Sequence, residues 1–190
     1  MVLLTACFGG RPLGYFEVDP YGRQLEGYEA KTITIVVDPG ILEAHLVDKR
    51  PHKRYHFTRF RTTLTANWTA LLQPHFRVVH TADTPPPTGY VLRIHRMTPR
   101  FEREVEGGVG AESASNLNAA VFDYDVELLK NGETLRNARG RVKGTRKFSI
   151  GAEWNEAMRS AFERTLEDAY AQLFVDTPAV PMTAVPTRGR

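Results

Sequence analysis

Three carboxylates lie at alternate positions of one apolar segment and are the first candidates for acid–base or cation chemistry. They are Asp123, Asp125 and Glu127. The apolar residues that alternate with them are Phe122, Tyr124, Val126 and Leu128. Neighbouring carboxylates can act as general acid and base or bind a divalent cation. A period of two, however, places all three on the solvent side of one strand, where burial does not raise their pKa values. We therefore predict a structural charge ladder with basic residues of the following strand, namely Arg136, Arg139 and Arg141.

Cys7 is the only cysteine and closes the string Leu4-Thr5-Ala6-Cys7. This string resembles a bacterial lipobox, in which the cysteine is acylated and becomes the mature N-terminus. Only three residues precede the string, whereas a secretion signal carries a basic segment and about 7–15 apolar residues before the cleavage site. Two interpretations follow: lipidation of Cys7 in a precursor that starts further upstream, or a small, half-buried thiol in an N-terminal strand. Phe8, rather than Asp, follows the cysteine, so the lipidated form is expected at the outer membrane.

Signals for hydrolytic, nucleotide or metal chemistry are weak. None of the four serines lies in a Gly-x-Ser-x-Gly string. The glycine-rich segment 107–110 lacks the Gly-Lys-Ser/Thr that completes a phosphate loop. His52 and His56 would share one face of a helical turn, but no Glu follows His52 and no third zinc ligand is evident. The sequence therefore predicts a non-enzymatic protein without metal or cofactor.

The densest charge cluster is the segment 49–61, KRPHKRYHFTRFR, which holds six of the 25 Lys and Arg residues and no acid. The rest of the chain has 19 basic against 22 acidic residues. The six cations are Lys49, Arg50, Lys53, Arg54, Arg59 and Arg61. Such a cluster can bind phosphates of lipid headgroups, lipopolysaccharide or nucleic acid, or an acidic protein. Nucleic acid is disfavoured because no RNA-binding aromatic motif or recognition helix is present. The alternative is a solvated turn whose Phe57 and Phe60 belong to the core.

The 190 residues carry a formal charge of +3 and are 42% hydrophobic, which is an ordinary globular composition. We expect a lipobox with a tether or docked arm over 1–30, one domain over 31–176 and a disordered tail over 177–190. The expected fold class is α+β, with a four- to five-stranded, mostly antiparallel sheet and two helices packed on one face. The order is β-α-β-β-β-β-α, over 32–37, 55–73, 76–82, 90–96, 119–129, 133–148 and 152–174. A long loop is expected over 103–118, and Trp68 and Trp154 should be buried.

Asn131-Gly132 predicts a two-residue hairpin turn, because both residues accept a positive φ. Strict pairing from this turn would set Tyr124 opposite Arg139 and so place a cation on the apolar face. A one-residue bulge near 136–138 corrects this, since it pairs Asp125 with Arg139 and Asp123 with Arg141. The bulged register also places Tyr124 over Gly140 and Phe122 over Val142.

The pattern over 31–176 resembles small lipoproteins of the Gram-negative periplasm and outer membrane. These include auxiliary lipoproteins of lipid-transport ABC systems, YajG-like lipoproteins and lipopolysaccharide-assembly lipoproteins. Besides the lipobox, the resemblance rests on the helix with Trp68 that ends at Pro74, and on the strand 89–94. It also rests on the hairpin at 131–132 and on the last helix, which ends in the string AYAQLF over 169–174.

The resemblance implies a lipid-anchored adaptor, scaffold or accessory component of an envelope transport or assembly system, on the periplasmic side of the outer membrane. Its partner would be an envelope protein or anionic lipid, and its oligomeric state is left open. The alternative is a soluble cytoplasmic module that binds an anionic ligand or nucleic acid, which applies if the lipobox match is chance.

Overall fold

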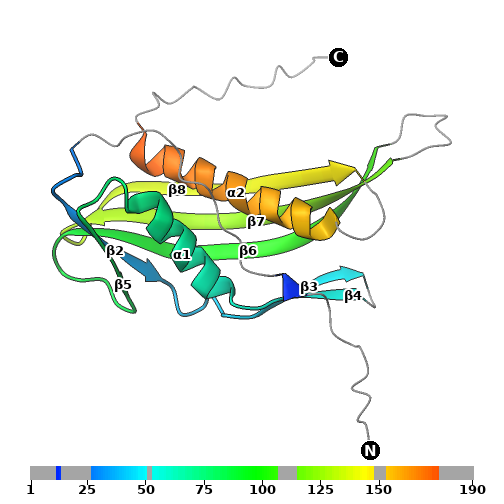
Figure 1. Ribbon diagram of the computed structural model, residues 1–190, viewed down its shortest axis with the longest axis horizontal. Helices are drawn as coiled ribbons and strands as arrows, with labels where there is room; N and C mark the ends of the chain where they lie inside the picture. Colours follow the sequence, from blue (N-terminus) through cyan, green and yellow to red (C-terminus); the bar gives the residue numbers. More distant parts are fainter. Residues whose placement is uncertain (1–11, 14–26, 51–52, 107–114, 148–152, 176–190) are drawn as a thin grey trace, which may run out of the picture.

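The computed structural model describes residues 12–13, 27–50, 53–106, 115–147 and 153–175, with side chains over 27–44, 57–102, 119–144 and 157–175. Two helices cover one face of a five-stranded sheet, and a small three-stranded sheet lies beside it (Figure 1). The strands are β1 (Pro12–Leu13), β2 (Thr32–Val37), β3 (His45–Arg50), β4 (Lys53–Phe57), β5 (Val78–Ala82), β6 (Tyr90–Glu106), β7 (Ser115–Lys130) and β8 (Glu133–Lys147). The helices are α1 (Phe60–Leu72) and α2 (Glu153–Phe174).

The large sheet is mixed, with strand order β5-β2-β6-β7-β8. The pairs β6–β7 and β7–β8 are antiparallel, whereas β2 runs parallel to both β5 and β6. The chain between β2 and β5 passes through α1, and a crossover of this kind is what parallel pairing requires. Every residue of β2 after Thr32 is buried, so this central strand does not show the apolar–polar alternation of a strand with one face in solvent. The α+β prediction is confirmed, with a larger parallel share than the sequence indicated.

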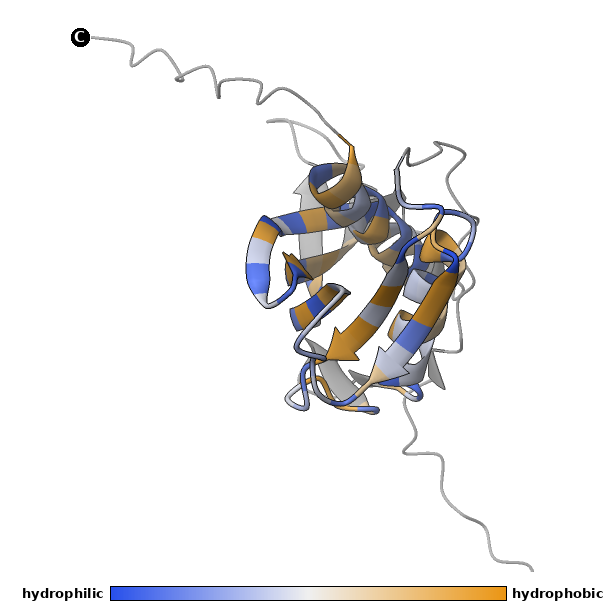
Figure 2. Ribbon diagram, turned by 90° about the vertical axis from the view of Figure 1, so that its left-hand side faces the viewer, coloured by the Kyte–Doolittle hydropathy of each residue, from blue (hydrophilic) through white to orange (hydrophobic). Residues whose placement is uncertain are grey.

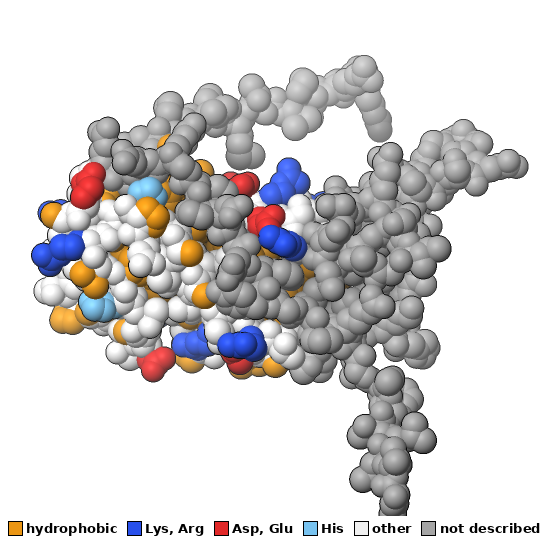
Figure 3. All heavy atoms as spheres, in the orientation of Figure 1, with side chains coloured by type: hydrophobic (Ala, Val, Ile, Leu, Met, Phe, Trp, Pro, Cys, Tyr) orange, Lys and Arg blue, Asp and Glu red, His pale blue; other side chains and the backbone are white. Residues whose placement is uncertain are grey.

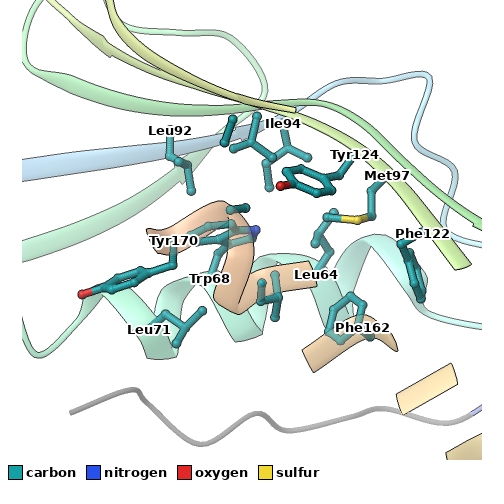
Figure 4. Close-up of a cluster of buried hydrophobic side chains, with 14 of the residues drawn as sticks. Leu64, Trp68, Leu71, Leu92, Ile94, Met97, Phe122, Tyr124, Phe162 and Tyr170 are labelled. Atoms are coloured by element: carbon teal, nitrogen blue, oxygen red, sulfur yellow. The ribbon is translucent and has the colours of Figure 1, made fainter. Parts of the chain in front are cut away.

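Both helices pack on the same face, α1 mainly against β2 and β5 and α2 mainly against β7 and β8 (Figure 1). Apolar and polar residues alternate in bands along the strands (Figure 2), which is the pattern of a sheet with one face in the core. Trp68 of α1 is fully buried in that core, and Figure 4 shows it among side chains of both helices and of the sheet. The burial of Trp68 is confirmed; the Trp154 side chain lies outside the described residues.

The β7–β8 hairpin confirms the predicted turn and register. Asn131 has φ 52° and Gly132 has φ 82°, and Lys130 pairs with Glu133 across the turn. The register then pairs Asp125 with Arg139, Asp123 with Arg141 and Tyr124 with Gly140. A Cβ atom on Gly140 would lie 2.7 Å from the Tyr124 ring, so the glycine makes room for the tyrosine.

The bulge itself lies slightly closer to the turn than predicted. Leu129 pairs with Thr134 and Leu128 with Arg136, so Leu135 is the extra residue. The side chain of Leu135 is 48% exposed, because the bulge removes this apolar residue from the alternation that directs side chains of β8 into the core.

Two expected elements were wrong. The predicted helix over 55–73 begins only at Phe60, because Lys53–Phe57 forms strand β4 and pairs with β3. Arg59, with φ 61°, separates the strand from the helix. The predicted loop over 103–118 instead continues β6 to Glu106 and starts β7 at Ser115, with those two residues paired. These ends of β6 and β7 are polar and are held by backbone pairing, so apolar alternation does not mark them as strands.

Candidate functional site

The structure divides the basic segment 49–61 among a hairpin, a turn and a helix. Strands β3 and β4 pair antiparallel, with Asp48 opposite Arg54 and Arg50 opposite Lys53. A register shift between Asp48 and Arg50 leaves Lys49 as an extra residue. We call β3, β4 and the two residues between them the cationic hairpin, because its closed end brings together the backbones of Lys49, Arg50, Lys53 and Arg54.

Strand β1 joins this hairpin to the N-terminal segment. Pro12 pairs with His56 and Leu13 with Phe57, in parallel with β4. Cys7 lies outside the described residues, but it precedes Pro12 by only five residues. A fully extended chain spans at most about 3.6 Å per residue, so Cys7 cannot be further than about 18 Å from Pro12, which lies beside β4. A lipid on Cys7 would therefore be held near the cationic hairpin.

Arg61, the last cation of the segment, has a structural role. Its guanidinium donates to the carbonyl oxygens of Val37, at 2.9 Å, and of Asp38, at 3.4 Å. The same group lies 3.5 Å from the Asp83 carboxylate, and its side chain is only 29% exposed. Arg61 thus links α1 to the end of β2, so we leave it out of the candidate anion-binding group. Arg59 is exposed and stays in it.

The N-terminus of α1 offers no vacant anion site, because Glu43 already caps it. The Glu43 carbonyl accepts from the backbone N–H of Phe60 at 2.7 Å. Its carboxylate accepts from the backbone N–H of Thr62 at 3.0 Å and from the Thr62 hydroxyl at 2.6 Å. A carboxylate at this position satisfies the exposed N–H groups and complements the helix dipole.

The predicted charge ladder is present on the face of β6, β7 and β8 opposite the helices, which we call the outer face. Arg139 lies 2.9 Å from Asp125, and Arg141 lies 3.9 Å from Asp123 and also contacts Glu102. Arg136 is not part of the ladder, since it donates to the carbonyl oxygen of Val175 at 3.3 Å. The bulge at Leu135 separates Arg136 from the alternation of the residues beyond it. The carboxylates are thus paired with cations along a strand.

Glu127 shows how these contacts act on a carboxyl group. Burial alone would raise its pKa, but hydrogen bonds from Thr134 and His95, together with the charge of Arg93, lower the pKa below its usual value. The His95 Nε2 atom lies 2.9 Å from the Glu127 carboxylate. A lowered pKa means that the ionised side chain stabilises the folded state above its unfolded pKa of 4.5, and that this stabilisation is lost as the pH falls through the folded value.

Replacing Glu127 with Gln is expected to lower the free energy of unfolding by about 1 kcal/mol at pH 7. The difference from wild type should shrink once the pH falls below the folded pKa, because Glu127 is then protonated in both states. Denaturant unfolding between pH 3 and 7 measures it. Asp123→Asn is the matched control, and it should cost less than about 1 kcal/mol because the pairs around Asp123 are more exposed. A difference that grows toward low pH would contradict this assignment.

The buried polar groups serve packing. The Tyr124 hydroxyl donates to Asp168 and accepts from Gln172 at 2.8 Å, which joins β7 to α2. Burial, followed by the bond to Asp168, raises the pKa of Tyr124. Burial also raises the pKa of Tyr170 to about 12 and lowers that of His75. Both tyrosines therefore stay neutral at physiological pH.

No group of three or more potential metal ligands occurs among the described residues. His56 lies in strand β4 and His52 lies outside the described residues, so the helical turn that would have joined them is not formed. None of the described helices is long and apolar enough to span a membrane. On the face shown in Figure 3, the described Lys and Arg side chains form several small groups rather than one patch.

No protein-family model matches the chain, and no curated protein matches it in sequence. Solved structures do resemble it. A homologue of a neuraminyllactose-binding haemagglutinin from Helicobacter pylori aligns with a TM-score of 0.50 and 10% identity, over 80% of this chain and 89% of that one. A minor lipoprotein from Acinetobacter baumannii gives 0.42 and 8%, over 77% and 92% of the two chains. Rare lipoprotein B from Shewanella oneidensis gives 0.40 and 11%, over 72% and 91%. The first similarity shows a shared fold, and the second and third of these chains are lipoproteins by name.

Proposed function

We propose that this chain is a lipid-anchored, non-enzymatic accessory protein of the Gram-negative cell envelope. In this proposal, the cationic hairpin contacts anionic headgroups of the membrane that holds the anchor. The observation that carries the proposal is the pairing of β1 with β4, since Cys7 lies at most about 18 Å from Pro12, which pairs with His56 of the hairpin. The Leu4-Thr5-Ala6-Cys7 string supports the anchor. Phe8 after the cysteine supports an outer-membrane destination.

The energetics favour joint action of the two features. A basic side chain near an anionic membrane surface gains about 1 kcal/mol, and the gain falls with added salt. A hairpin with four cations and one acid near its closed end therefore adds a useful but weak attraction to an anchor that already restricts the domain to the surface. Without the charge attraction of the hairpin, the lipid anchor would still tether the domain, but the domain would be free to reorient at the membrane surface.

Replacing Lys49, Arg50, Lys53 and Arg54 with Ser is expected to reduce binding of the unlipidated domain to vesicles with anionic lipid by tenfold or more, because four positive charges are lost. Binding to neutral phosphatidylcholine vesicles should be weak for both proteins. Vesicle co-sedimentation at low and high salt measures the effect. The melting temperature of the variant is measured alongside and should change little, so that a loss of binding is not a loss of folding.

The matched control replaces four exposed cations elsewhere with Ser, which changes the net charge equally. These are Lys31, Arg77, Arg96 and Lys130. Equal loss of binding by the two variants, or binding by the parent that salt does not weaken, would refute a specific role of the hairpin. Binding of a single-stranded oligonucleotide but not of anionic vesicles would favour the soluble alternative. An unmodified Cys7 in the intact mass of the protein, expressed in a Gram-negative host with its upstream gene region, would remove the anchor.

A further inference from the structure

Strand β8 is the last strand of the large sheet, and within the described part of the chain it pairs with β7 alone. It is long, at 15 residues, and contains six Lys and Arg residues but only one acid. A strand in this position presents one row of backbone N–H and C=O groups away from its neighbour, and such a row can accept another strand.

Two observations identify the residues whose peptide groups point outward. The two-residue turn makes Lys130 and Glu133 a hydrogen-bonded pair, and after the bulge Arg136 faces β7 in the same way. Alternation then turns the peptide groups of Arg139 and Arg141 away from β7. Independently, the guanidinium of Arg164 on α2 donates to the carbonyl oxygen of Lys143 at 3.0 Å, which fits an outward-facing Lys143.

The same contacts limit the open stretch. The bulge at Leu135 distorts the edge near the turn, and Arg164 occupies the carbonyl of Lys143 at the other side. Between them lie Asn137, Arg139 and Arg141. We call this stretch the cationic edge. Its length suits a partner segment of about five residues, because alternate residues face the edge.

The side chains along the cationic edge define the chemistry of that partner. Arg139 pairs with Asp125 at 2.9 Å and yet is 68% exposed, and the Arg141 side chain is 52% exposed. The acids that these arginines contact belong to β6 and β7, so they lie on the side of β8 that is already paired within the sheet. An added strand would approach from the opposite side, where residues directly across from Arg139 and Arg141 gain from being acidic.

We propose that the cationic edge binds an extended, acidic segment of a partner protein as a sixth strand of the sheet. Antiparallel pairing with β8 of a second copy is unfavourable, because it would bring the two arginine rows together. Backbone hydrogen bonds would supply the affinity, and acidic side chains at alternate positions would supply the specificity. This inference is independent of the lipid anchor and of the cationic hairpin, since it rests only on β8 and its neighbours.

The probe for this proposal is a synthetic peptide of alternating Thr and Glu, ten residues long, with blocked ends. On addition of the peptide, hydrogen exchange at the backbone amides of Arg139 and Arg141 is expected to slow at least tenfold, while the amides of Gly140 and Val142 change little. The matched peptide of alternating Thr and Lys should give no protection. Amide-resolved NMR on the domain measures both.

Two variants separate the charge requirement from the backbone requirement. Arg139→Ser combined with Arg141→Ser should weaken binding of the acidic peptide about tenfold. Arg139→Pro removes one outward N–H and leaves the β7 ladder intact, so it should abolish binding while the domain stays folded. The control, Lys31→Ser with Arg77→Ser, changes the net charge equally and should bind as the parent does.

Three results would overturn the proposal. One is equal protection by the lysine peptide. Another is binding without protection of the Arg139 and Arg141 amides, which would place the peptide elsewhere. The third is no binding at millimolar peptide by a folded domain. Loss of vesicle binding with this peptide binding intact would reject the membrane role alone, so the two proposals fail separately.

Discussion

Replacing Trp68 with Ala is expected to lower the free energy of unfolding by about 3–5 kcal/mol. The indole is fully buried on the inner side of α1, and the helix is held to the sheet largely through this side chain and its neighbours Leu64 and Leu71 (Figure 4). Removing the indole leaves a large cavity. The sheet and α2, which lie around it, cannot both move in to fill that cavity without losing their other contacts. Denaturant unfolding, followed by circular dichroism, measures the loss.

Trp68→Phe is the matched variant. The indole Nε1 atom is buried without a hydrogen-bond partner in the described part of the chain. An unpaired buried donor is itself unfavourable, by about 1–3 kcal/mol. The phenylalanine removes that donor and keeps most of the aromatic contact, so this variant should be clearly more stable than Trp68→Ala. An alanine variant that unfolds within about 1 kcal/mol of wild type would show that the indole is not central to the core.

Replacing Gly144 with Ala is expected to destabilise the domain by about 3 kcal/mol, at the upper end of the usual cost of overpacking. A Cβ atom at this position would lie 2.5 Å from the backbone nitrogen of Ala161 and 2.6 Å from the backbone oxygen of Ala157. These are helix backbone atoms, so no side-chain rotation relieves the contact. The whole of α2 would have to move away from β8, which loosens the contacts along that helix.

Gly40→Ala is the control for Gly144→Ala. At Gly40 the added Cβ would meet only the Asp38 carboxylate, at 3.1 Å, and that side chain can rotate away. The control should therefore unfold within about 1 kcal/mol of wild type. Equal stability of the two variants would mean that α2 and β8 are further apart than the structure has them. A melting temperature measured on both variants is enough to decide.

The predicted start of the first helix was wrong because two periodicities overlap in the basic segment. Phe57 and Phe60 lie three residues apart, which fits a helical stripe, and both are buried. Phe57, however, is the last residue of a strand that pairs with β3, and Arg59, with φ 61°, separates that strand from the helix that begins at Phe60. Spacing alone does not distinguish one continuous helix from a strand followed by a helix, because residues of different elements can bury their side chains in the same core.

The charge ladder could be predicted from the sequence in more detail than the arrangement of the basic segment 49–61. The ladder on the outer face followed from local information, since period-two alternation and the Asn131-Gly132 turn together limit the register to a few choices. The sequence showed the basic segment as a cluster of charge. It did not show that this segment is divided among the β3–β4 hairpin, a turn and helix α1. The structural role of Arg61 depends on the carbonyl oxygens of Val37 and Asp38, more than 20 residues away in sequence.

The sequence by itself determined the α+β class, the hairpin with its bulged register, the last helix and the burial of Trp68, because each depends on contacts or periodicities within a short stretch of chain. Only the tertiary structure decided that β2 pairs in parallel with two strands, and that β1 docks on β4 beside the cationic hairpin. The tertiary structure also decided that β8 is an edge strand of the large sheet, so that Arg139 and Arg141 lie along a sheet edge. Pairing between segments distant in sequence is selected by the packing of the whole core, and no local pattern of residue types specifies which strand edge finds a neighbour.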